Sequence, residues 1–151
     1  MGDTMTVERR PAHLPAGWSF RYALPGGREA GFGWIPEQTV LVYTRGWERA
    51  DFTMPLVVVV GRAGAPPLVG TEESFAQSVD LGVPGVDAVY FDGITVPRLD
   101  ANRDFAGVAW RTGEVHSITA RSAAGTFAVR APRTVSREEL IAVLVSLDPG
   151  A

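Results

Sequence analysis

Apolar and polar residues alternate along most of the chain in short runs, and a period of two predicts β-strands with one buried and one exposed face. The runs are rich in β-branched and aromatic residues, which favour strands. Between them lie 17 glycines and 11 prolines, as expected where turns join short antiparallel strands. The predicted strands cover residues 19–24, 31–35, 39–44, 56–60, 88–91, 105–110, 114–120 and 126–130.

The connections between these runs predict how the strands pair. The connection between strands 39–44 and 56–60 is short, so we expect these two to pair as antiparallel central strands. Residues 111–113, Arg-Thr-Gly, form a turn signal with glycine at the position that favours a positive φ. They predict a hairpin between strands 105–110 and 114–120.

Two segments lack a clear strand pattern. Residues 92–104 contain Pro97 and five charged side chains, and predict a loop. Residues 71–79 fit either a short helix or an irregular loop. Asp87 and Asp92, on either side of the strand between them, are interpreted as turn residues.

The clearest element is a C-terminal helix over residues 137–147. Ser136 and Glu139 have the spacing of a capping box, and Val135 and Leu140 can form a hydrophobic staple around it. The apolar stripe at helical spacing consists of Leu140, Ile141, Leu144 and Leu147. Such a stripe must cover an apolar surface, and the sheet is the candidate surface in this chain.

The fold class that follows is α+β, with a curved antiparallel β-sheet and the C-terminal helix packed on one face. A chain of 151 residues with 46% apolar side chains is long enough for one core. We expect a flexible N-terminal segment over residues 1–13 and a single domain over residues 14–148.

Composition excludes several classes of function. The chain has no cysteine and no lysine among its 14 basic residues, which excludes thiol and lysine chemistry and resembles the codon bias of a GC-rich bacterial genome. A net charge of −3 without a basic cluster argues against nucleic acid as a partner. The longest apolar run, residues 56–60, is too short for a membrane-spanning helix. We expect a cytoplasmic location for the chain as it stands, and an extracytoplasmic one if a leader or anchor was removed.

Catalytic and metal-binding motifs are absent from the sequence. Its two histidines, His13 and His116, are far apart, so we predict neither a metal site nor a cofactor. Glu114 lies two residues from His116 and shares its sheet face if both are in one strand. The pair therefore supports an alternative in which His116 is a general base, although a partly buried polar role is the ordinary interpretation of such a histidine.

The four tryptophans are Trp18, Trp34, Trp47 and Trp110. Trp110 lies on an alternating strand and is predicted to be in the core. Trp47 lies in a polar turn and is the best candidate for an exposed contact residue. We predict Trp47, Trp34 and His116 as residues that contact a ligand or partner.

The order of several segments resembles a known bacterial family of unknown function. The matching segments are residues 14–18, 41–43, 56–60, 83–88, 108–118 and 135–140. That family occurs in extracytoplasmic regions of anti-sigma factors and in secreted or lipid-anchored proteins, and is similar to outer-membrane lipoprotein carriers. The resemblance implies no catalytic residue. His116 stands where the family usually has an aromatic residue.

We therefore expect a noncatalytic binding or sensing module that presents a sheet face or a loop edge to a protein, peptide or lipid. The loops over residues 45–51 and 93–104 are the expected recognition elements. Two alternatives remain: a small hydrolase or isomerase that uses Glu114 and His116, and a self-associating structural subunit, that is, a homo-oligomer.

Overall fold

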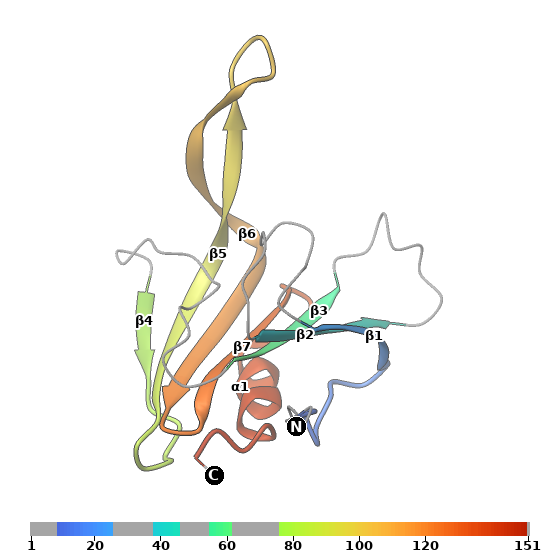
Figure 1. Cartoon of the computed structure of the whole chain (residues 1–151), viewed down its shortest axis with the longest axis vertical. Coiled ribbons are helices and arrows are strands. Elements are labelled where there is room, and N and C mark those ends of the chain that lie inside the picture. The colour runs from blue at the N-terminus through green and yellow to red at the C-terminus, as the bar shows by residue number, and fades with distance from the viewer. Residues whose placement is uncertain (1–8, 26–37, 46–54, 62–75, 151) are drawn as a thin grey trace, which may run out of the picture.

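A single seven-stranded antiparallel sheet with one C-terminal helix on its face forms the fold, as Figure 1 shows in a computed structural model. The structure describes residues 9–25, 38–45, 55–61 and 76–150. The strands are β1 Trp18–Pro25, β2 Gln38–Arg45, β3 Leu56–Gly61, β4 Ala76–Val79, β5 Asp87–Leu99, β6 Phe105–Ser122 and β7 Gly125–Pro132. In the sheet they follow the order β1-β2-β3-β7-β6-β5-β4. This confirms the predicted α+β class with a curved sheet.

The predicted central pair is confirmed, because β2 and β3 pair with Leu41 opposite Val58. β3 then pairs with β7, which lies far along the chain. The run of apolar residues in β3 makes both of its faces apolar, as expected for a strand that is buried on two sides. The sheet therefore needs cover on both faces at its centre.

The helix α1, Arg137–Val145, covers one face of this centre. Its Leu140, Val143 and Leu144 are fully buried in a cluster with the alternate residues of the strands. The sheet residues of this cluster are Trp18, Leu41, Tyr43, Leu56, Val58, Ala88, Tyr90, Ile118, Ala120, Phe127, Val129 and Ala131. This cluster is the main core of the protein.

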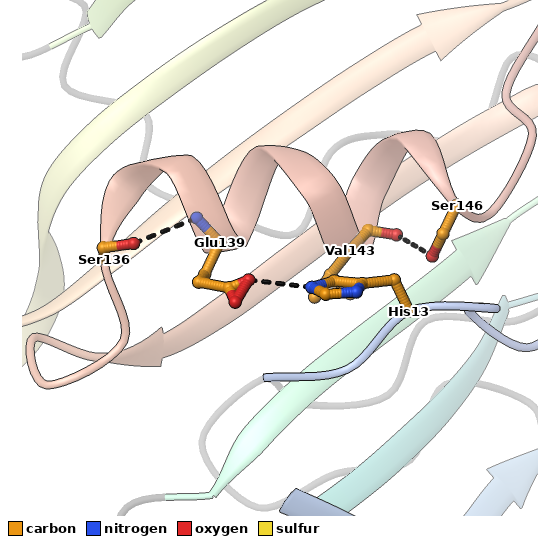
Figure 2. Close-up of polar contacts among 5 residues, drawn as sticks. All are labelled: His13, Ser136, Glu139, Val143 and Ser146. Carbon is orange, nitrogen blue, oxygen red and sulfur yellow. Dashed lines mark hydrogen bonds and ion pairs between the residues drawn. The ribbon is translucent and has the colours of Figure 1, made fainter. Parts of the chain in front are cut away.

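The N-terminal cap of α1 is the one that the sequence predicts. The Ser136 hydroxyl accepts a hydrogen bond from the backbone N–H of Glu139 at 3.1 Å (Figure 2). Val135 and Leu140, the two staple residues, are both buried in the core cluster. The carboxylate of Glu139 turns outward instead, and its Oε2 lies 2.7 Å from Nε2 of His13.

Residues 9–13, which we call the N-terminal strap, contact both ends of α1. His13 pairs with Glu139 in the first turn. Arg9 donates to the carbonyl oxygens of Leu147 and Asp148, where a positive charge is favourable because helix C-termini carry a partial negative charge. The helix has no basic residue in its own last turn. The division into a flexible segment 1–13 and a domain 14–148 stays a prediction, since residues 1–8 lie outside the described part.

The sheet face opposite α1 is buried as well. Its apolar cluster consists of Val40, Val42, Val57, Val59, Phe91 and Ala128. Three hydroxyl groups on this face, those of Thr44, Ser117 and Thr119, are buried and have no hydrogen-bond partner among the described residues. This face is therefore not an open surface at its centre.

Two predicted elements were wrong, and both errors concern β5 and β6. The hairpin at residues 111–113 does not exist, because β6 continues through them as one strand of 18 residues. The predicted loop over residues 92–104 is mostly strand, since β5 extends to Leu99. At the Thr-Gly signal the register shifts from Asp92 opposite His116 to Ile94 opposite Arg111. Residues 112–115 thus form a bulge opposite Gly93, whose φ of 124° favours glycine.

The long β5–β6 hairpin projects beyond the rest of the sheet as a twisted two-stranded ribbon (Figure 1). We call this part the arm. It comprises residues 94–99 of β5, residues 105–111 of β6 and the turn between them. β4 pairs with β5 only as far as Phe91, and β7 pairs with β6 only from Val115 onward. The arm therefore has no third strand among the described residues.

Three smaller predictions differ from the structure or lie outside it. Residues 76–79, within the segment predicted as helix or loop, form the edge strand β4. The strand predicted over residues 31–35 lies outside the described residues. Asp87 and Asp92 are wrongly interpreted as turn residues, because both lie within β5 and pair with β6.

Replacing Ser136 by alanine tests the cap of α1. We expect S136A to lower the free energy of unfolding by about 1 kcal/mol, because the N–H of Glu139 loses its acceptor. S136D keeps an acceptor at this position and should retain nearly all of the stability. Denaturant unfolding measures both, and an unchanged midpoint for S136A would show that the cap contributes nothing.

Replacing Thr119 by valine tests the buried hydroxyls. The valine has nearly the same shape, and it removes a buried polar atom that has no partner among the described residues. We expect T119V to raise the free energy of unfolding by about 1 kcal/mol. T134V, at an exposed position, is the control and should change it by less than about 0.5 kcal/mol. A less stable T119V would contradict this expectation.

Candidate functional site

His116 lies in β6 at the base of the arm and is only 2% exposed. Its Nε2 is 2.6 Å from the carbonyl oxygen of Val135, just before α1. Its Nδ1 is 2.6 Å from the hydroxyl of Tyr90 in β5. The imidazole thus links two strands to the start of the helix.

These two contacts determine the tautomer of His116. A carbonyl oxygen only accepts, so Nε2 carries the proton and donates to Val135. In the neutral ring Nδ1 then accepts from the Tyr90 hydroxyl. Burial lowers the pKa of His116, and the hydrogen bond to Val135 only partly opposes this effect. Burial also raises the pKa of Tyr90, and the charge of Asp92 raises it further. Both groups are therefore neutral at physiological pH.

Charged groups surround this buried pair at the surface. Arg133 forms an ion pair with Asp92, and the Arg137 guanidinium lies 4.8 Å from the centre of the Tyr90 ring. Arg133 directly follows β7, and Arg137 is the first residue of α1. These contacts add to the attachment of the helix to β5.

The arrangement does not support His116 as a general base. Both ring nitrogens are occupied, one by a hydroxyl and one by a carbonyl oxygen, so neither faces a carboxylate or a space for substrate. The side chain of Glu114 lies outside the described part of the structure. His116 has the geometry of a structural residue.

The other predicted contact residues, Trp34 and Trp47, lie outside the described residues, as does the side chain of Trp110. Among the described residues there is no group of three metal-ligating side chains. No helix in the same part of the chain is long and apolar enough to cross a membrane. The contact roles of Trp34, Trp47 and His116 stay predictions.

The exposed apolar residues of the described chain point to the arm instead. Phe105 is 69% exposed and Leu99 is 59% exposed, more than any other large apolar side chain described. Leu99 is paired directly with Phe105 across the ribbon, and directly opposed residues share a face. The two side chains therefore form one apolar contact point, which we call the tip pair.

The turn that joins the tip pair is held by the side chain of Asp100. Its Oδ1 accepts from the N–H of Asn102 at 2.8 Å and from that of Asp104 at 2.9 Å. Two backbone hydrogen bonds, between Asp100 and Asp104 and between Arg103 and Asp100, close the same loop. Arg103 adopts a φ of 65°. A turn with this many internal bonds presents the tip pair in one arrangement.

The sequence contains a local signal for this turn. Asp at the first position of a turn, with Asn two residues later, is typical of an Asx turn, and apolar residues flank it on both sides. Residues 93–104 were predicted as a recognition loop, but Leu99 and Phe105 were not identified within or beside it. The strand pattern of residues 94–99 was not recognised, because Pro97 and the nearby charged residues are typical of a loop.

The lowered pKa of His116 predicts how stability depends on pH. The folded state favours the neutral ring, so below the unfolded-state pKa of about 6.5 the unfolded chain binds more protons. Stability is therefore complete above that pH and falls as the pH drops toward the lower pKa of the folded state.

We expect H116Q, which is neutral throughout, to remove most of this fall as the pH drops below about 6.5. H13Q, which changes the other histidine of the chain, is the control and should retain the fall. Urea unfolding at several pH values measures the effect. An undiminished fall in H116Q would contradict the assignment.

Comparison with known proteins assigns no family to this chain. It matches no protein-family model, no curated protein and no solved structure. The functional interpretation therefore rests on the residues of the chain itself.

Proposed function

We propose that this protein is a noncatalytic binding module whose arm inserts the tip pair, Leu99 and Phe105, into an apolar pocket of a partner protein. The observation that carries the proposal is the exposure of these two paired side chains at the end of a projecting ribbon. Aromatic anchors that enter a pocket commonly dominate protein–protein binding.

The internal bonds of the turn support the same proposal. Binding is weakened when side chains and loops must be ordered on association. The turn after Leu99 already has its backbone N–H groups paired with Asp100. The arm therefore loses little conformational freedom when its tip is bound.

The chemistry of the tip favours a protein over a lipid surface. The turn lies beyond the tip pair and contains Asp100, Arg103 and Asp104, all exposed. Membrane insertion of the tip pair would carry these charges toward the hydrocarbon, at a cost of about 2.5 to 3.5 kcal/mol each near its centre. A protein pocket can hold the two apolar side chains and leave the charges at a solvated rim.

The test begins with a photoreactive amino acid at position 105 in cells that produce the protein, to identify the partner. A matched probe at Gln77, which is exposed on β4, gives the background. Binding of the purified partner is then measured with tip variants.

We expect F105A to weaken binding by about 10- to 100-fold, as for an anchor residue, and L99A to weaken it less. V145A, which shortens an exposed apolar side chain on α1, is the control and should bind as the parent protein does. Full binding by L99A/F105A would overturn the proposal. So would capture by lipid vesicles together with loss of that capture in F105A.

A further inference from the structure

We infer that the outer edge of β6 in the arm pairs with the same edge of a second copy of this chain, so that two arms form a four-stranded antiparallel sheet. The inference goes beyond the proposed function, because it uses backbone groups along the side of the arm and not the tip pair. It starts from the pairing of the arm and from Pro97.

Pro97 determines which backbone groups of the arm point outward. It is paired with Val108, and it has no N–H to donate. Residues that exchange two hydrogen bonds alternate with residues that exchange none. Pro97 and Val108 must form a pair of the second kind, so the N–H and C=O of Val108 point away from β5.

The same alternation applies along the regular part of the arm. Thr95, two residues before Pro97, is paired with Trp110, and the register does not shift between this pair and the Pro97–Val108 pair. The N–H and C=O of Trp110 therefore also point outward, whereas those of Ala109 point to β5. The outer edge of β6 therefore has an outward N–H and an outward C=O at each of two residues, Val108 and Trp110. The outer edge of β5 lacks one donor, at Pro97.

This asymmetry favours a closed dimer. Addition of a β5 edge to a β6 edge would repeat from copy to copy and give a ring or an open fibre, and proline at an edge strand blocks such an addition. Pairing of β6 with β6 uses the same edge of both copies around a twofold axis. This pairing is antiparallel, and it gives a closed dimer because no further copy can add to the same edges.

The charges of the arm permit two identical copies to meet. The arm, residues 94–111, contains three arginines, Arg98, Arg103 and Arg111, and two acidic residues, Asp100 and Asp104. Its net charge is therefore only +1, and salt screens the repulsion between two exposed charges of this size. A two-stranded ribbon alone is marginally stable in water, and a second ribbon beside it adds the missing pairing.

The occupant that the structure favours is a second copy, because it brings the same β6 edge, which no other described strand pairs with in the arm. An extended peptide from another protein would use the same N–H groups. The experiment distinguishes the two, because only self-pairing depends on the concentration of this chain alone.

Sedimentation equilibrium of the whole chain should show a dimer over a range from about 1 μM to 1 mM, as expected for a small interface. V108P removes an outward N–H and should weaken the dimer at least tenfold. T95P makes the matching change on the β5 edge and should leave the dimer intact. F105A should also leave it intact, so that failure of this inference and failure of the proposed function are distinguishable.

Hydrogen exchange tests the same edge without a substitution. The amides of Val108 and Trp110 should become protected as the concentration rises, while that of Ala109 stays protected at all concentrations because it bonds within the arm. A strictly monomeric protein would overturn the inference. A dimer that V108P leaves unchanged, or one that F105A abolishes, would also overturn it.

Discussion

Packing of α1 against β6 and β7 is the contact on which the rest of the structure depends. Leu140, Val143 and Leu144 are fully buried there, and together with Val135 they cover the alternate residues of the strands. Burial of a leucine or valine side chain stabilises a fold by about 1.5 to 3 kcal/mol. The helix is held by polar contacts at both ends, from Ser136 and His13 at its start and from Arg9 at its end. These contacts fix where the helix lies on the sheet.

This packing also explains why the arm is the exposed part of the molecule. Both faces of the sheet centre are buried, so the centre offers no open apolar surface. The strands of the arm continue past this centre, beyond the last residues that pair with β4 and β7. Leu99 and Phe105 at its tip therefore stay exposed and are not covered by any other described element. The proposed binding role uses this exposed part of the molecule.

The sequence predicted elements well where a local rule determines them. The β-branched and apolar runs of β2 and β3 predicted strands, and the short connection between them predicted their pairing. Ser136 and Glu139 predicted the start of α1 because capping acts within one turn. The sequence did not predict the arm, because a Thr-Gly pair such as Thr112-Gly113 is found in β-bulges as well as in hairpin turns. Pro97 was interpreted as a breaker, although an edge position requires no N–H from it.

The candidate site was harder to predict than the fold. The hydrogen bonds of His116 join it to Tyr90 and Val135, which are 26 and 19 residues away. No local pattern identifies such partners, so sequence reasoning placed His116 in a strand but could not show that both nitrogens are occupied. The exposure of Leu99 and Phe105 likewise depends on where the neighbouring strands end. These are properties of the tertiary structure.

The link between the N-terminal strap and α1 has a consequence for synthesis of the chain. The first described residues bind the last element, and β3 in the first half pairs with β7 in the second. Contacts so distant in sequence form slowly, because a long loop must close before they stabilise the chain. During translation the early strands would leave the ribosome before their partners exist. The domain is therefore expected to complete its folding only after α1 has left the ribosome.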